Sequence, residues 1–230
     1  MASTGRNRRG EARLPSALVI VAAIALYALL PEQLILGPRL VIPSLEAVLL
    51  IAVVFVNPHR MTRETPWSRA TALALVCLIA VANTVALVLL LRQLVGTDGS
   101  QAVQLLLAAG QVWLTNVIVY GLAYWELDRG GPVARIKLPR HALPLADFRF
   151  PQDEDADNVI EVRMGSSTFS DWIPSVVDYL YMSLTNSSAF SPTDTMPLST
   201  RAKILMGIES TSALVISVLV IAKGVGSLGQ

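Results

Sequence analysis

Long apolar runs dominate the chain and predict membrane-spanning helices. A helix rises about 1.5 Å per residue, so about 20 apolar residues are needed to cross a hydrocarbon core of about 30 Å. Five runs approach this length, at 14–30, 40–56, 70–91, 102–125 and 204–222. The pattern therefore predicts an all-α fold, a polytopic transmembrane helix bundle with five full spans plus one re-entrant or short sixth helix.

The runs divide the chain into four predicted parts: a basic cytoplasmic tail at 1–13, a four-span bundle at 14–126, a polar segment at 127–172, and a last part at 173–230. The polar segment has few periodic apolar residues and is too short to bury a core of its own, so we expect an irregular cytoplasmic loop. Its acidic cluster at 153–157 lacks the alternating ligands and central glycine of a calcium loop, and we interpret it as solvated charge.

The composition agrees with a membrane location. Hydrophobic residues make up 53% of the chain and charged residues 15%, which is unusual for a soluble domain. Basic residues are distributed over the loops and do not form one patch, so we expect the lipid bilayer as a partner and no nucleic acid. The single Cys77 lies within an apolar run, and no disulfide within the chain is expected.

The distribution of basic residues predicts the orientation. Lys and Arg gather in the tail and in the segments 57–69 and 126–172, whereas the alternate turns hold only Arg39 and Arg92. Positive residues accumulate on the cytoplasmic side, so the N-terminus should be cytoplasmic. The first apolar run follows basic residues like a secretion signal but lacks a small-x-small cleavage site, so we interpret it as an uncleaved span of a bacterial inner-membrane protein.

No motif of catalysis or of cofactor binding is evident. His59 and His141 have no Cys, Asp or Glu at ligand spacing, so we expect no metal site. A nucleophile elbow, a P-loop and a dinucleotide fingerprint are all missing from the sequence. We therefore expect no cofactor and no enzymatic activity, and an enzyme acting on lipids is a third alternative.

The C-terminal part contains the most informative pattern. Tyr181, Ser183, Asp194, Pro197 and Glu209 fall at matching positions when this segment is laid on the pore loop and inner helix of two-span potassium channels, which it resembles. The Thr-Val-Gly-Tyr-Gly filter of those channels is replaced here by residues 189–193, which contain no glycine and include a proline. Because proline fixes φ and glycine supplies the unusual angles of the filter, potassium selectivity is not expected.

The resemblance implies a pore-loop-like segment with a degenerate filter. Its residues are Thr185, Asn186, Ser187, Ser188, Ala189, Phe190, Ser191, Pro192, Thr193 and Asp194. Residues 173–190 are numerous enough to cross the membrane completely, which would give six spans. However, the polar cluster and Asp178 make a lipid-facing span costly, so a re-entrant or protein-surrounded segment is favoured.

Two carboxylates, Asp178 and Glu209, are predicted at membrane depth. Carboxylates are expensive in hydrocarbon and must be neutralised, paired or hydrated, so each is a functional candidate. A structural alternative stays open for both. Asp178 would then lie near the interface, and Glu209 would bind hydroxyls such as those of Thr185 or Ser210 across packed helices.

The whole chain also resembles a family of uncharacterised bacterial multi-pass proteins. The resemblance rests on a signature at 179–198, a Trp-Glu-Leu-Asp-Arg-Gly-Gly-Pro motif at 125–132, and Phe-Pro-Gln at 150–152. It implies the architecture and no mechanism. Polar residues within the spans, Asn83 and Asn116 among them, are interpreted as hydrogen bonds between helices.

The leading functional hypothesis is a non-canonical channel or permeation protein for an unidentified ion or small solute, with 185–194 as its constriction. The alternative is a non-conducting structural or regulatory membrane protein that keeps a pore-loop-like fold and binds an unknown protein partner through 127–172. Small residues at Gly207, Ser210 and Ala213 indicate close helix packing in a homo-oligomer or within the bundle.

Overall fold

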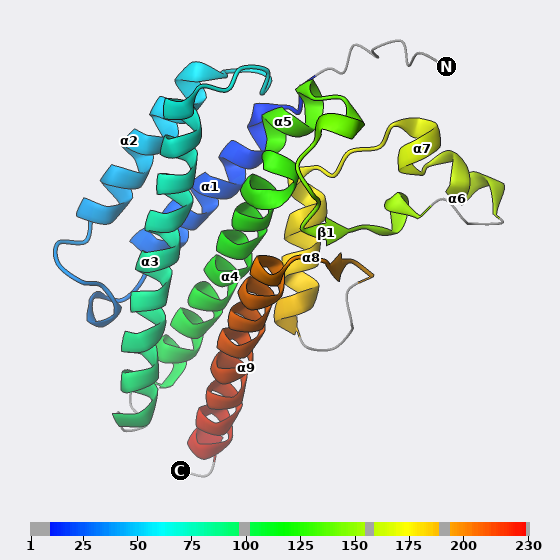
Figure 1. The fold of residues 1–230 in the computed structure, drawn as a ribbon. Coiled ribbons are helices and arrows are strands. Elements are labelled where there is room, and N and C mark those ends of the chain that lie inside the picture. Colours follow the sequence, from blue (N-terminus) through cyan, green and yellow to red (C-terminus); the bar gives the residue numbers. More distant parts are fainter. Residues whose placement is uncertain (1–9, 97–101, 155–158, 189–193, 229–230) are drawn as a thin grey trace.

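The structure is a computed structural model that describes residues 10–96, 102–154, 159–188 and 194–228. The chain is mostly helical, with short 3-10 turns and two very short strands (Figure 1). The prediction of an all-α membrane protein is confirmed in this general form. The helices and strands are α1 Arg13–Ala28, α2 Val41–Val56, α3 Pro66–Gly96, α4 Ala102–Leu127, α5 Pro132–Lys137, β1 Phe148–Arg149, α6 Ile160–Met164, α7 Ser167–Ser170, α8 Val176–Ser188, β2 Met196–Pro197 and α9 Thr200–Leu228.

Three helices are long and apolar enough to cross a membrane, at Pro66–Val95, Val103–Gly130 and Thr200–Val225. They correspond to α3, α4 and α9. The predicted first two spans form α1 and α2, which are apolar but have 16 residues each, a length of about 24 Å. The turn between α1 and α2 contains Pro31, Pro38 and Gly37, whose φ of +78° is left-handed, and these residues end one helix before the next begins.

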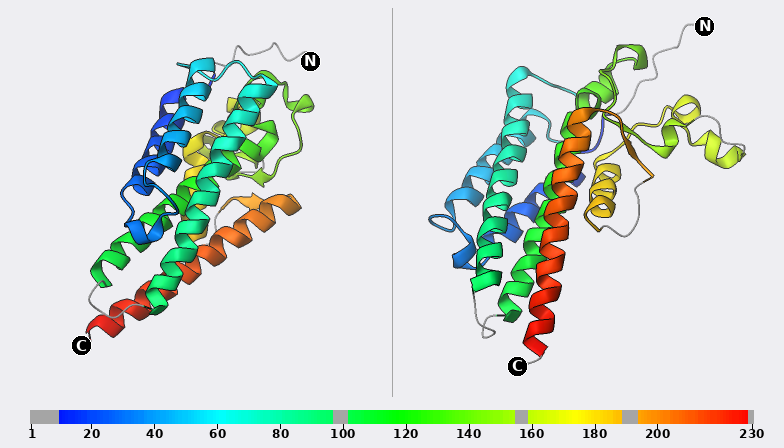
Figure 2. Two further views of the ribbon diagram at one scale, coloured as in Figure 1. Left: turned by 90° about the vertical axis from the view of Figure 1, so that its left-hand side faces the viewer. Right: turned by 60° about the horizontal axis from the view of Figure 1, so that its bottom comes forward.

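Helix α4 lies at the centre of the bundle. It packs against α1, α3, α8 and α9, with α1, α2 and α3 on one side and α8 on the other (Figures 1 and 2). Two buried clusters make up the core. One surrounds Trp125, Tyr124 and Tyr179, and the other contains Tyr27 and Leu90. The residues of α4 are therefore more enclosed than those of α9, which leaves most of its surface to the outside.

The segment 127–172 has more structure than the sequence predicted. It contains α5, α6, α7 and β1, and β1 pairs antiparallel with β2, so that Phe148 lies opposite Pro197. Phe148 and Phe150 are buried, and their rings lie 5.0 Å from the ring of Tyr124 and 5.3 Å from that of Tyr179, respectively. The segment thus has no need of its own core, because its aromatic residues enter the core of the helix bundle.

The turn after α4 brings this segment back onto the bundle. Arg129, Gly130 and Gly131 have φ values of 51°, 82° and 96°, and Pro132 then begins α5. The φ of Gly131 is strained for any residue with a Cβ, and that Cβ would lie 3.1 Å from the Glu126 carbonyl oxygen, so glycine is favoured here. The Gly-Gly-Pro motif therefore ends α4 and allows α5 to pack against it.

Candidate functional site

Glu209 on α9 is the best-bonded polar group between the helices. It is fully buried, and its carboxylate accepts hydrogen bonds from the Tyr124 hydroxyl at 2.6 Å, the Asn186 amide at 2.6 Å and the Ser187 hydroxyl at 3.0 Å. The Ser183 hydroxyl is a fourth donor. A buried carboxylate is tolerated when donors satisfy its lone pairs, and here α4 and α8 supply them together.

The positions of these donors follow from helix geometry. Ser183, Asn186 and Ser187 are three and four residues apart on α8, so they share one face. This face can approach α4 closely at Gly121, where a Cβ would lie 2.8 Å from the side chain of Leu180 and 3.1 Å from its Cα. The polar stripe of α8 therefore faces the interior of the bundle.

The start of α8 and residues 196–201 lie at the same end of the bundle. Near the start of α8, the Tyr179 hydroxyl donates to Asp128 at 2.5 Å, and the Asp147 amide donates to the same carboxylate at 2.7 Å. Beyond α8, the Leu198 amide donates to the Asp147 carbonyl at 2.8 Å, and the Arg201 guanidinium binds the Asp147 carboxylate. With 13 residues, α8 is about 20 Å long, which is shorter than the hydrocarbon core of a bilayer.

The predicted pore-loop residues that the structure describes divide into three groups. Asn186 and Ser187 bind Glu209, whereas the hydroxyls of Thr185 and Ser188 donate to carbonyls of their own helix. Asp194 is exposed. The remaining predicted residues lie outside the described part of the chain: Ala189, Phe190, Ser191, Pro192 and Thr193.

Asp178 and Glu209 have different surroundings. Asp178 is half-buried in the first turn of α8 and accepts hydrogen bonds from the Ser175 amide and hydroxyl, both at 2.7 Å, which is one half of a helix-capping arrangement. Glu209 does bind hydroxyls, but they belong to Tyr124, Ser183 and Ser187 and not to Thr185 as expected. The hydroxyl contacts of Glu209 correspond to its structural alternative, whereas the position of Asp178 near the interface stays a prediction.

A second polar network joins the 127–172 segment to the bundle. Arg129 is buried, and its guanidinium lies 2.5 Å from the Asp153 carboxylate and 3.4 Å from that of Asp128. Burial alone would raise the pKa of Asp153, but the bonds from Arg129 and Ser167 hold it below its ordinary value. The interpretation of Asp153 as solvated charge is therefore wrong, because a distant arginine pairs with it.

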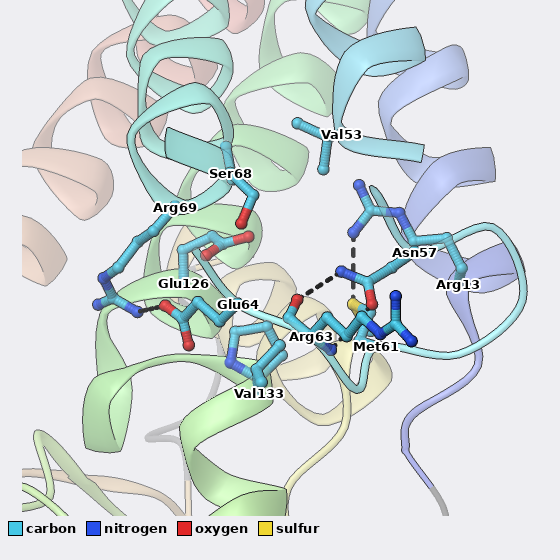
Figure 3. A pocket seen from close by; sticks show the side chains of 12 residues that line it. Arg13, Val53, Asn57, Met61, Arg63, Glu64, Ser68, Arg69, Glu126 and Val133 are labelled. Carbon is cyan, nitrogen blue, oxygen red and sulfur yellow. Dashed lines mark hydrogen bonds and ion pairs between the residues drawn. The ribbon is translucent and has the colours of Figure 1, made fainter. Parts of the chain in front are cut away.

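A pocket opens at the polar end of the bundle, where several helices begin or end (Figure 3). Arg13 is 5% exposed, its Nη1 lies 3.3 Å from the sulfur of Met61, and its Nε has no hydrogen-bond partner among the described residues. Glu126 is 6% exposed, and Arg135, Arg13 and Arg69 attract it electrostatically, although none of the described residues donates a hydrogen bond to it. The lining residues are Arg13, Val53, Asn57, Met61, Arg63, Glu64, Ser68, Arg69, Ala72, Glu126, Pro132 and Val133.

Hydrogen bonds hold the loop that forms the floor of the pocket. The Asn57 carboxamide accepts from the amides of Thr62 at 3.1 Å and Arg63 at 3.0 Å, and donates to the Arg63 carbonyl at 2.6 Å. The guanidinium of Arg69 binds Glu64 at 2.9 Å and also donates to the Gly130 carbonyl. These hydrogen bonds hold the loop and Arg69 in place around the pocket. Arg13 and Glu126 also line the pocket and take no part in these bonds.

The charged groups that sequence reasoning missed include the buried Glu46 and Glu126 and the half-buried Glu11. Glu46 on α2 is 1% exposed, and neither carboxylate oxygen has a hydrogen-bond partner in the described chain. Glu11 accepts from the Trp125 indole at 3.0 Å and the Val176 amide at 2.8 Å, and burial raises its pKa. A charged residue interrupting an apolar run was a usable signal for Glu46, whereas Glu11 offered none.

Two sequence-based expectations concern packing and metals. Asn83 on α3 donates to Asn116 on α4 at 3.4 Å, which is the interhelical hydrogen bond that we predicted for such residues. Within the described ranges, no three His, Cys, Asp or Glu side chains gather where they could hold a metal ion.

Comparison of the chain with family models, with curated proteins and with solved structures finds no match. The resemblance to potassium-channel pore loops and to a bacterial multi-pass family therefore stays a prediction. A functional interpretation must follow from the geometry of the chain itself, above all from α8, Glu209 and the pocket.

Proposed function

We propose that this chain is an integral membrane protein with a structural or regulatory role, built on a pore-loop-like unit that does not conduct. In this proposal α1, α2, α3, α4 and α9 are five spans and α8 is re-entrant. The observation that carries it is the binding of α8 to Glu209 by three of its own side chains. These bonds lock α8 to α4 and α9.

A conducting path requires polar groups that face water or the permeating species. The polar groups of α8 are otherwise engaged, because Asn186 and Ser187 bind Glu209 and Thr185 bonds its own helix. Its outer face carries exposed apolar or aromatic side chains, Val177 and Tyr181. This division of the two faces supports packing as the role of α8.

The five-span arrangement needs α1 and α2 to cross with about 24 Å of helix each. A bilayer can thin locally at a short helix, at a cost of fractions of a kcal/mol per Å of mismatch. The basic tail and the segments 57–69 and 126–172 support a cytoplasmic N-terminus by the positive-inside tendency. We propose the bacterial inner membrane as the location on the same grounds.

Permeation is the second candidate, and the path of the chain favours it. Residues 176–179 and 196–201 lie at one end of the bundle, as the two ends of a pore loop do. Glu209 lies about 14 Å along α9 from its start, a depth suited to a permeation site. In a homo-oligomer, residues 185–194 would then surround a common axis.

Flux through liposomes separates the two candidates. We expect purified protein to pass no potassium, sodium, chloride or glycerol, and Glu209→Ala to pass none either, because α8 packs and does not line a path. Empty liposomes and liposomes with a known pore-forming peptide set the lower and upper limits. Saturable flux in the wild type that Glu209→Ala alters would reject the proposed role and establish permeation.

A regulatory role also predicts a protein partner for the 127–172 segment. Deleting this segment would remove Phe148 and Phe150 from the core, so substitutions on α6 are the better test. Ile160, Val162 and Met164 are all exposed there, and α6 stands away from the bundle (Figure 1). We expect a stoichiometric partner to co-purify with the wild type and to be lost when these three residues become serine. Co-purification that the triple variant leaves unchanged would place the partner elsewhere.

A further inference from the structure

The pocket between Arg13 and Glu126 lies where the helices leave the apolar part of the bundle. Arg13 begins α1, Ser68 and Arg69 are in the first two turns of α3, and Glu126 is in the last turn of α4. Trp67 is 84% exposed beside the pocket, which is typical of a membrane interface. Lipid phosphates and amines lie at this level of a bilayer, so they are the ligands at hand.

Two opposite charges within the pocket attract each other electrostatically, but neither has a well-matched hydrogen-bond partner among the described residues. A buried guanidinium needs oxygen acceptors, and the thioether of Met61 is a weak acceptor for Arg13. Glu126 needs donors and receives no hydrogen bond from the described residues. Arg13 and Glu126 do not form an ion pair with each other in the part of the chain that the structure describes, and both line the same opening (Figure 3). A ligand that carries an acceptor and a donor would satisfy both.

The other charges of the pocket define which end of the ligand lies where. Arg63 is exposed and lines the pocket together with Arg13, so two guanidinium groups can surround an anion. Arg69 is already bound by Glu64 and by the Gly130 carbonyl. Glu126 is attracted by Arg135, Arg13 and Arg69 without accepting a hydrogen bond from a described residue, so it is the carboxylate that a hydrogen-bond donor of the ligand can reach.

We propose that this pocket binds the headgroup of a phospholipid with a primary amine, of the phosphatidylethanolamine type. The phosphate accepts hydrogen bonds from Arg13 and Arg63, and the ammonium donates to Glu126. Phosphatidylglycerol provides the phosphate without the amine, and phosphatidylcholine provides a quaternary amine that has no N–H to donate. The proposal depends on the membrane location and is independent of whether the protein conducts.

Native mass spectrometry of the full-length protein tests the proposal. The protein is reconstituted into vesicles of equal parts phosphatidylethanolamine, phosphatidylglycerol and phosphatidylcholine, extracted in mild detergent, and its retained lipids are counted. We expect phosphatidylethanolamine to be retained about ten-fold over phosphatidylcholine, because a charged hydrogen bond is lost with the latter. Equal retention of the three lipids would overturn the proposal.

Three variants assign the contacts. Glu126→Gln should remove the preference for phosphatidylethanolamine over phosphatidylglycerol, since the ammonium loses its carboxylate. Arg13→Gln and Arg63→Gln should lower retention of both lipids about ten-fold. Because Arg13 is buried, helicity by circular dichroism confirms folding, and the exposed Arg63 gives an independent result if Arg13→Gln unfolds.

Arg92→Gln is the matched control, because Arg92 is exposed at the opposite end of α3 and the substitution removes the same charge. Its lipid retention should equal that of the wild type, and a loss equal to that of Arg63→Gln would overturn the assignment of the pocket. Free O-phosphoethanolamine at millimolar concentration should not displace the lipid, which is also held by its chains. Complete displacement would mean that the pocket serves a soluble ligand and would overturn the lipid proposal.

Discussion

Glu209 and Glu46 are both fully buried carboxyl groups within apolar helices, yet their surroundings are opposite. Glu209 on α9 receives hydrogen bonds from four side chains of α4 and α8, whereas Glu46 on α2 receives none from the described residues. The α4, α8 and α9 side of the bundle is therefore joined by polar contacts, and the α1, α2 and α3 side mainly by apolar packing. A buried charge stabilises a helix bundle only where the neighbouring helices provide partners for it.

Removal of Glu209 should have the largest effect. Glu209→Ala removes the acceptor of the buried Tyr124 hydroxyl and the interhelical bonds from Ser183, Asn186 and Ser187, and we expect the free energy of unfolding to fall by about 3–5 kcal/mol. Ser183 and Asn186 keep the Val117 and Met206 carbonyls as acceptors. Unfolding in mixed micelles with increasing SDS measures this change. Glu209→Gln keeps one acceptor oxygen and should lose less. Equal stability of Glu209→Ala and wild type would contradict the inference that Glu209 holds α4, α8 and α9 together.

A single donor of the same cluster should matter less. Tyr124→Phe removes the 2.6 Å hydrogen bond to Glu209 and leaves the ring in place, so the loss should be about 1.5–3 kcal/mol. Tyr120→Phe is the matched control, one helical turn away on α4 and without a hydrogen bond in the described part of the chain. If Tyr124→Phe and Tyr120→Phe lowered the free energy of unfolding equally, the hydrogen bond from Tyr124 to Glu209 would not be a specific source of stability.

Substitution of Glu46 should change stability in the opposite direction. Glu46→Leu replaces a buried carboxyl without partners by an apolar side chain, and we expect a gain of about 1–2 kcal/mol in the same SDS assay. Glu32→Leu, in the exposed turn between α1 and α2, removes the same charge and should give no gain. A loss of stability in Glu46→Leu would mean that Glu46 has a partner and that the contrast with Glu209 is false.

The smallest effect should be local and dependent on pH. The pKa of Asp153 is lowered, so its bond to Arg129 stabilises the fold fully above the ordinary pKa of 3.8 and is lost as the pH falls through the lower, folded-state value. Asp153→Asn should therefore speed hydrogen exchange at 148–153 at pH 7, with a cost of about 1 kcal/mol, because the buried Arg129 keeps Asp128 and the Phe148 carbonyl as partners. Glu154→Gln is the control, because its ion pair with Arg149 is half exposed. Equal exchange in Asp153→Asn and wild type would refute the role of this pair.

Parts of the candidate site could be predicted from sequence. Glu209 is conspicuous in an apolar run, and its need for hydroxyl partners follows from the cost of a charge in hydrocarbon. Ser183, Asn186 and Ser187 share a helical face by their spacing alone. Which donors reach Glu209 could not be predicted, because Tyr124 is 85 positions away and its contact depends on how α4 and α9 cross.

The sequence by itself determined the local features: helices where apolar runs are long, a cap where Ser175 and Asp178 meet, and a reversal at the Gly-Gly-Pro turn. These depend on the chemistry of neighbouring residues. Only the tertiary structure decided that Glu209 is satisfied, that Glu46 is not, and that Arg13 and Glu126 share a pocket. The partner of a buried charge depends on which helices pack together. That packing depends on residues far apart in the chain, so the local sequence does not determine it.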